Sequence, residues 1–133
     1  MIDYSGQSVL VTGAASGIGA ALSVALADRG AYVICADIDE EGLDQTLKAL
    51  SDQGERIVCD LAEADAASAL IAQAFASRGA LALVCSNAGI GHRAKVTDPD
   101  LDFAAIRRLF EINFHAGLKN CQCLCEQTER IGC

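Results

Sequence analysis

The sequence has few of the residues and segments that mark non-globular and membrane proteins. Its 133 residues contain one proline and no tryptophan. Hydrophobic residues make up 52% and charged residues 21%, which excludes a disordered or collagen-like composition. No stretch reaches the ~18 apolar residues of a membrane span, and the first residues lack the basic and apolar segments of a secretion signal. We therefore expect one globular domain in the cytoplasm, without membrane contact.

Basic residues are also scarce. Ten Lys and Arg stand against 18 Asp and Glu, so the formal net charge is −8. Such a surface does not attract a phosphate backbone, and we expect no nucleic-acid partner. An anionic dinucleotide is still compatible with this charge, because backbone N–H groups at a helix N-terminus bind phosphate without Lys or Arg.

Cysteine, in contrast to these scarce residue types, is frequent: the sequence contains seven. Three of them lie in or at the end of apolar runs, where a free thiol behaves as a small hydrophobic group: Cys35, Cys59 and Cys85. The other four stand in a tail over residues 121–133, which we predict to be the end of a helix: Cys121, Cys123, Cys125 and Cys133. On a helix Cys123 points away from the other two nearby thiols, so we expect no metal site.

Apolar runs alternate with helix-spaced segments along residues 8–85. Four runs, at residues 8–12, 31–36, 56–59 and 80–85, predict strands. Because the runs are continuous, both faces of the sheet are expected to be covered, as in a parallel α/β sheet. Proline is favoured at the first position of a helix, so we predict that a helix starts at Pro99. A further helix is predicted to begin near Asn113.

A glycine-rich segment, Thr12-Gly13-Ala14-Ala15-Ser16-Gly17-Ile18-Gly19, joins the first predicted strand to the first predicted helix. Its glycines permit a tight turn and let the backbone approach a pyrophosphate at the helix N-terminus. An ordinary glycine-rich turn is the alternative, but the strand before it and the helix after it favour a nucleotide site. We assign these residues to cofactor binding: Gly13, Ser16, Gly17, Ile18 and Gly19.

The form Thr-Gly-x-x-x-Gly-Ile-Gly resembles the motif of the short-chain dehydrogenase/reductase family. Three further matches stand in order at the ends of predicted strands: Asp37, the pair Asp60-Leu61, and Asn87-Ala88-Gly89. The resemblance covers residues 1–120 as an NAD-binding region, which corresponds to the N-terminal half of that family's domain with a truncated or altered C-terminus. It implies a Rossmann-type doubly wound parallel sheet, here incomplete, with about four strands and flanking helices.

Asp37 follows Gly19 at close to the roughly 20-residue spacing of the carboxylate that binds the adenosine ribose. This carboxylate would repel a 2′-phosphate, and no Arg or Lys stands beside it at residues 14–16 or 37–39. We therefore expect NAD rather than NADP, with Ile38 in the same site. A helix cap or a solvated turn residue is the alternative for Asp37.

The resemblance assigns roles to the remaining matches. Asp60 and Leu61 would border the adenine, although Asp60 could instead cap the third helix. Residues 87–89 would support the sheet edge and bring Asn87, Ala88 and Gly89 close to the cofactor. Asn113 matches the family's catalytic Asn, which helps to hold a proton relay through water; the alternative is a helix-start residue.

The family's catalytic Ser, Tyr and Lys have no match in the sequence. The only tyrosines are Tyr4 and Tyr32, and neither is followed by Lys four positions later. The resemblance implies an NAD-dependent oxidoreductase that moves hydride between nicotinamide and a small alcohol or ketone, the substrate of the full-length relative. This chain itself is expected to be catalytically incomplete.

Two other functions stay open. The first is a non-catalytic nucleotide-binding or interaction module derived from the same family, whose helix from Asn113 pairs with a full-length subunit. The second is a Rossmann-like methyltransferase, against which the Gly-Ile-Gly form and the Asn-Ala-Gly segment argue. A homo-oligomer is compatible with the family resemblance.

Overall fold

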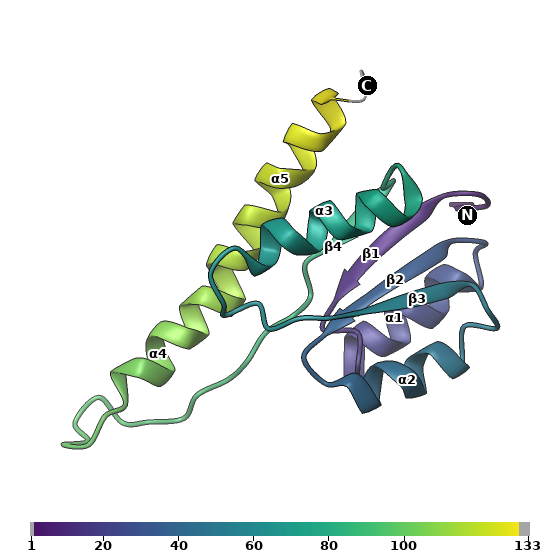
Figure 1. Ribbon diagram of the computed structural model, residues 1–133. Coiled ribbons are helices and arrows are strands. Elements are labelled where there is room, and N and C mark those ends of the chain that lie inside the picture. Colours follow the sequence, from purple (N-terminus) through teal and green to yellow (C-terminus); the bar gives the residue numbers. More distant parts are fainter. Residues whose placement is uncertain (1, 131–133) are drawn as a thin grey trace.

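The computed structural model describes residues 2–130 as a parallel sheet with helices on both faces (Figure 1). The strands are β1 (Ser8–Thr12), β2 (Tyr32–Asp37), β3 (Gly54–Val58) and β4 (Leu83–Cys85). The helices are α1 (Gly17–Ala27), α2 (Glu40–Lys48), α3 (Ala66–Arg78), α4 (Phe103–Phe110), the π-helical η1 (Glu111–His115) and α5 (Ala116–Arg130).

The four strands follow the order β3-β2-β1-β4, and every neighbouring pair is parallel. The chain therefore steps outward from β1 to β3 on one side and then returns to place β4 on the other side. In such a sheet, ligands bind outside the carboxyl ends of the strands at the point where the order reverses. Here that point lies between the carboxyl ends of β1 and β4. The predicted parallel α/β fold is confirmed.

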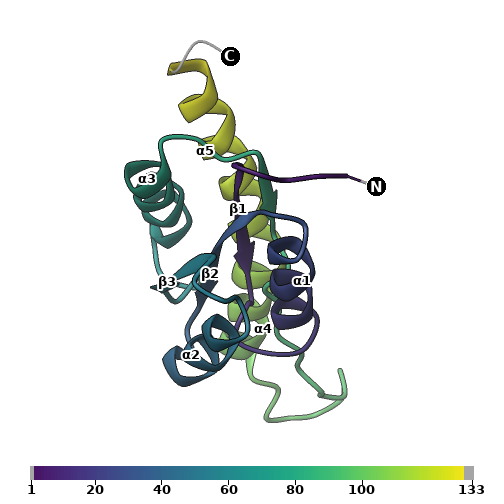
Figure 2. The same cartoon turned by 90° about the vertical axis from the view of Figure 1, so that its right-hand side faces the viewer.

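Alternate residues of the central strands face two separate apolar layers. Val9 and Val11 of β1 pack in a cluster with Leu26 of α1 and Leu43 of α2. Leu10 points the other way, into a cluster with residues of α3 that include Leu70, Ile71, Ala74 and Phe75. Figure 2 shows α1 and α3 on opposite sides of β1. Both faces of the strands are thus buried, as their continuous apolar sequences predict.

The fourth strand is shorter than the predicted run at 80–85. Gly79 ends α3 in the left-handed conformation, with φ of 78°, and its N–H donates to the carbonyl of Phe75. The connection after this cap continues to β4, which starts only at Leu83. The N–H of Ala82 nevertheless donates to the carbonyl of Ser8 in β1 at 2.8 Å, so the predicted run meets the sheet just before β4 begins.

The predicted helix start at Pro99 is wrong. Pro99 lies in a turn, and α4 begins at Phe103, because the carboxylate of Asp102 caps the helix. Its Oδ1 accepts the N–H groups of Ala104 and Ala105 at 2.8 and 3.0 Å, and these two hydrogen bonds lower the pKa of Asp102.

The predicted helix start near Asn113 is also wrong. Helical structure continues without a break from α4 through η1 into α5, and Asn113 lies inside the π-helical segment. α5 packs beside α3 (Figure 1), where the thiol of Cys123 lies 3.3 Å from Oγ of Ser68. Cys121 and Cys125 are exposed, so the predicted division of the thiols between faces is confirmed. Cys133 lies outside the described residues.

Candidate functional site

Thr12 joins the ends of β1 and β4 where the strand order reverses. Its hydroxyl is buried and accepts the N–H groups of Asn87 and Ala88 at 3.0 and 3.1 Å. The side-chain amide of Asn87 donates to the carbonyl of Thr12 at 3.1 Å. The segment after β4 is therefore held against the glycine-rich turn by hydrogen bonds from both of these side chains, and Asn87 itself is not among the residues that line the cavity at this edge.

Two glycines let the backbone make this turn. Gly13 has φ of 69°, and a Cβ there would lie 2.9 Å from Cα of Ala88. A Cβ on Gly19 would lie only 1.9 Å from the carbonyl oxygen of Gly13. A side chain at either position would have to displace backbone atoms, so both glycines are needed for the turn itself.

The N-terminus of α1 is open. Its N-cap residue, Ser16, makes no side-chain capping hydrogen bond, and the first turn holds no acidic residue. Gly17 has φ of 53°, and a Cβ there would meet nothing within 4 Å. Ser16, Gly17 and Ile18 are all exposed. This end of the helix therefore presents backbone N–H groups and a positive dipole end to solvent, an arrangement that suits an anion.

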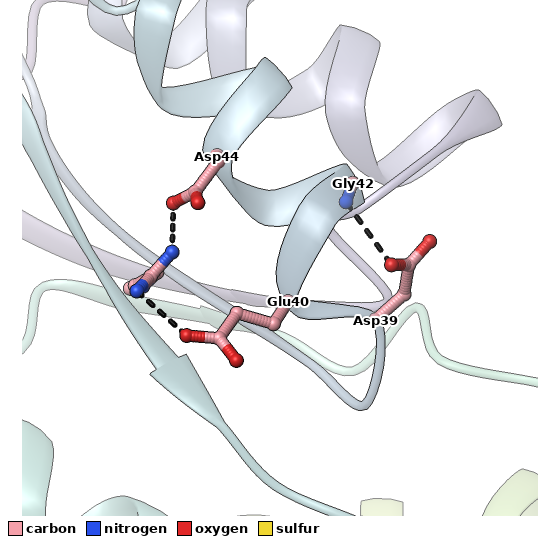
Figure 3. A network of polar contacts seen from close by, with 5 residues as sticks. Asp39, Glu40, Gly42 and Asp44 are labelled. Carbon is pink, nitrogen blue, oxygen red and sulfur yellow. Dashed lines mark hydrogen bonds and ion pairs between the residues drawn. The ribbon is translucent and has the colours of Figure 1, made fainter.

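Asp37 stands at the end of β2 and faces the same turn. Its Oδ2 accepts the N–H of Ala15 at 3.1 Å, and its Oδ1 accepts the N–H of Asp39 at 3.1 Å. The residue that caps α2 is Asp39, whose carboxylate accepts the N–H of Gly42 at 3.1 Å (Figure 3). Asp37 is therefore not the helix cap that the sequence left as an alternative.

The same close-up shows two ion pairs between α2 and β3. A guanidinium group from β3, that of Arg56, contacts the carboxylates of Glu40 and Asp44 on the first turns of α2 (Figure 3). The guanidinium offsets the repulsion between the two carboxylates. All three side chains are at least 33% exposed, so these ion pairs contribute little to the free energy of unfolding, and none of the three residues lines the cavity at the strand ends.

A cavity of about 130 Å³ opens at the carboxyl ends of the strands. Most of the predicted site residues line it: Gly13, Asp37, Ile38, Asp60, Leu61, Ala88 and Gly89. Two apolar side chains at its rim, Ile38 and Ile90, are 58% and 40% exposed. Ile18 at the start of α1 is 78% exposed. An apolar rim beside an open helix N-terminus suits a ligand that has both a flat apolar part and a phosphate.

Asp60 forms an ion pair across this cavity with Arg108 of α4. The guanidinium donates to Oδ2 at 2.8 Å, and the N–H of Ala62 donates to Oδ1 at 2.9 Å. Burial opposes the charged form, but the hydrogen bonds from Arg108 and Ala62 and the charge of Arg108 outweigh it and lower the pKa of Asp60. The N-cap position of α3 is occupied by Asp65, which makes no side-chain capping hydrogen bond, so Asp60 is not the helix cap that the sequence left as an alternative.

Cys59 lies in the floor of the cavity beside both carboxylates. Burial raises the pKa of its thiol to about 11, and the negative charges of Asp37 and Asp60 add to this shift. The thiol is therefore protonated at neutral pH and acts here as a small apolar lining group.

Asn113 is exposed and does not line the cavity, but it contacts Ile90, which does. Its Oδ1 accepts the N–H of Ile90 at 2.8 Å, and its Nδ2 donates to the carbonyl of the same residue at 2.9 Å. It is the third residue of the five-residue π-helical segment, whose wider turns often occur at functional sites. Asn113 therefore fixes the loop after β4 to the long helix, rather than starting a helix.

A second, larger hollow of about 630 Å³ lies at the other end of the strands. It is lined by residues such as Asp28, Gly30 and Ala49, at the C-terminal ends of α1 and α2. Helix C-termini carry partial negative charge and disfavour an anion. The smaller cavity at the carboxyl edge is thus the better candidate for a nucleotide, although it is the less roomy of the two.

The sequence did not single out Arg108, Cys59 or Ile90 as site residues. Arg108 stands next to another arginine, and no spacing in the sequence connects it with Asp60. Ile90 directly follows the Asn-Ala-Gly segment, and this position is the one feature of the sequence that could have indicated it as a site residue. Within residues 2–130, no group of three or more His, Cys, Asp or Glu side chains is arranged to hold a metal ion. In the same range no helix is both long and apolar enough to cross a membrane.

Known dehydrogenases match nearly the whole chain. The family model for short chain dehydrogenases matches residues 7–131. A cis-4-hydroxycyclohexanecarboxylate dehydrogenase of Sinomonas cyclohexanicum is 42% identical over 113 residues, covering 83% of this chain and 45% of that protein. The (+)-borneol dehydrogenase 1 of Salvia officinalis is 38% identical over 113 residues, covering 84% of this chain and 43% of that protein.

Solved structures agree with these matches. A metagenomic short-chain oxidoreductase in complex with NADP has a TM-score of 0.86 and 28% identity, over 93% of this chain and 57% of that one. A short chain dehydrogenase from Mycobacterium smegmatis has a TM-score of 0.81 and 30% identity, over 92% of this chain and 54% of that one. The chain thus spans less than half the length of the curated relatives named above and about half of these structures.

Proposed function

This chain belongs to the short chain dehydrogenase family, and on that basis we propose that it binds NAD at the carboxyl edge of its sheet. The observation that carries the proposal is the open N-terminus of α1 beside Asp37. The helix end offers unpaired N–H groups to a pyrophosphate, and the carboxylate offers acceptor oxygens to ribose hydroxyls.

The residues present fit a dinucleotide. Gly17 leaves open space at the first turn of α1, which is where a phosphate would approach the backbone. The exposed side chains of Ile18, Ile38 and Ile90 provide apolar surface for the flat parts of the cofactor. Leu61 and the carboxylate of Asp60 would border the adenine, with an acceptor oxygen available to its amino group.

The charges around the cavity favour NAD over NADP. Two carboxylates line it, those of Asp37 and Asp60. Arg108 is the one basic residue among the described lining residues, and it is already paired with Asp60. A 2′-phosphate beside Asp37 would place like charges together without a free cation to compensate. One structural neighbour is a complex with NADP, so the preference is a property to be measured for this chain itself.

For the whole protein we propose an oxidoreductase that acts on a small alcohol or ketone. A bound nicotinamide dinucleotide supplies the hydride acceptor or donor. The residues described here bind and orient the cofactor, and Asn113 holds the loop at Ile90 in place. The sequence contains no Tyr followed four positions later by Lys. We therefore propose that these 133 residues bind NAD but do not by themselves oxidise alcohols.

Calorimetric titration of the chain with NAD and with NADP tests the cofactor assignment. We expect NAD to bind at least about fivefold more tightly, because one uncompensated charge contact costs on the order of 1 kcal/mol or more. The Asp37→Ala variant should lose both affinity for NAD and the preference. The Asp39→Ala variant, which removes the neighbouring cap of α2, is the matched control and should keep the preference. Equal or tighter binding of NADP to the unmodified chain would overturn the assignment.

A further inference from the structure

Arg108 contributes to the site from a helix that has little other attachment to the molecule. All residues of α4 are described, and none of its side chains is buried. The guanidinium of Arg108 nevertheless reaches the carboxylate of Asp60 at the far end of β3, with 2.8 Å between Nη2 and Oδ2. Asp60 is 48 residues away in sequence. The ion pair therefore connects α4 with the end of the sheet across the cavity.

Stability does not explain this contact well. The side chain of Arg108 is 44% exposed and that of Asp60 is 23% exposed, and ion pairs at such positions contribute little to the free energy of unfolding. The geometry of the carboxylate gives a better explanation. One oxygen is held by the N–H of Ala62 and the other by Arg108, so the plane of the group is fixed. Each oxygen still has a second lone pair, and part of the group faces the cavity.

We propose that Arg108 is a positioning residue for the base of the nucleotide: it holds the Asp60 carboxylate so that an oxygen accepts a hydrogen bond from an exocyclic amine. This inference rests on the proposed dinucleotide site and adds to it a residue that makes the site selective for a base with an amino group. A carboxylate only accepts hydrogen bonds. A carbonyl in place of the amine would therefore set its own acceptor oxygen against an acceptor oxygen of Asp60, with no donor between them. The lowered pKa of Asp60 agrees with a carboxylate that stays charged.

The chain provides a matched control at the next position. Arg107 carries the same charge on the same helix, is exposed, and does not line the cavity. The variants Arg108→Ala and Arg107→Ala therefore change the net charge equally but differ in their contact with Asp60. Arg108→Gln is a second variant that keeps much of the side chain and removes the charge.

The experiment measures binding of NAD and of its hypoxanthine analogue, which has a carbonyl in place of the adenine amine. The unmodified chain should prefer NAD by about tenfold, the value of one hydrogen bond to a charged group. Arg108→Ala and Arg108→Gln should reduce this preference to about twofold or less, mainly by weakening NAD binding. Arg107→Ala should keep the preference. Asp60→Asn should lose it, and Arg108→Ala should then add little, because both changes act through one carboxylate.

Several results would overturn the positioning role. They are an unchanged preference in both Arg108 variants, an equal loss in Arg107→Ala, or an equal weakening of both dinucleotides on removal of Arg108. A selective loss of NADP binding in Arg108→Ala would show that the guanidinium binds a 2′-phosphate instead. If the unmodified chain binds neither dinucleotide, the proposed function itself fails and the role of Arg108 falls with it. Circular dichroism of each variant verifies that the fold is retained.

Discussion

Two glycines of the first turn allow the requirements of the fold and those of the proposed ligand to be tested separately. Gly19→Ala would place a methyl group 1.9 Å from the carbonyl oxygen of Gly13 and 2.7 Å from the side-chain amide of Asn87. This clash can be relieved only if the carbonyl of Gly13 moves. That movement also disturbs the hydrogen bonds from Asn87 to the carbonyls at the end of β1. Gly17→Ala would meet nothing within 4 Å, but it would force an L residue to adopt φ of 53°.

The two substitutions should therefore lower the free energy of unfolding by different amounts. Overpacking costs about 1–3 kcal/mol, and a buried hydrogen bond that loses its partner costs about 1–3 kcal/mol more, so Gly19→Ala should cost about 2–6 kcal/mol. Gly17→Ala should cost about 1–2 kcal/mol, the penalty of the left-handed conformation. At about 4 °C per kcal/mol for a domain of this size, Tm should fall by about 8–24 °C for Gly19→Ala and about 4–8 °C for Gly17→Ala.

Gly6 supplies the control for ligand binding. It has φ of 74°, a Cβ there would also meet nothing within 4 Å, and it precedes β1 at the far end of the strand from the cavity. Gly6→Ala and Gly17→Ala should therefore lower Tm by similar amounts. Only Gly17→Ala should weaken NAD binding, by about tenfold or more, because its methyl group occupies the space in front of the α1 N-terminus.

The assays are thermal unfolding followed by circular dichroism and calorimetric titration with NAD. A Gly19→Ala variant as stable as the unmodified chain would show that the turn has more freedom than its contacts indicate. Equal NAD affinity in the Gly17→Ala and Gly6→Ala variants would refute the placement of a phosphate at the start of α1.

Further predictions concern the thiols, Asn113 and turnover. Alkylation of Cys59 should be slow at pH 8 and rise about tenfold per pH unit towards pH 11, as shown by mass spectrometry of labelled peptides, because burial and nearby carboxylates raise its pKa to about 11. The same raised pKa predicts that stability falls between about pH 9 and 11, since the unfolded thiol ionises first. Cys121 and Cys125 are exposed and should be labelled before the buried Cys35 and form thiol-dependent oligomers on non-reducing gels; monomers that resist labelling would contradict this. Asn113→Ala should lower Tm by about 4–8 °C through loss of two hydrogen bonds to Ile90, and an unchanged Tm would show that they contribute nothing. With NAD and secondary alcohols, the nicotinamide absorbance should not change, and turnover abolished by Asn113→Ala would show that another residue acts as the base.

The sequence alone determined the layers of the fold and the place of the glycine-rich turn. Continuous apolar strands such as residues 8–12 can be buried only if both faces are covered, and this pattern is local. The glycine-rich turn is also local, because its conformation depends on residues that follow one another. Asp37 could be found for the same reason, since it ends the strand next to that turn.

Tertiary structure alone decided which side chains complete the site. Asp60 and Arg108 are 48 residues apart, Asn113 and Ile90 are 23 apart, and Thr12 and Asn87 are 75 apart. No periodicity connects such partners: the first two pairs depend on how α4 and η1 pack over the strand ends, and the third depends on the pairing of β1 with β4. The misplaced helix starts have a related cause: the Asp102 cap and the π-helical segment control the helix path, and neither Pro99 nor Asn113 reveals them. The sequence proposed candidate residues for a nucleotide site, whereas packing decides which of them face one another across the cavity.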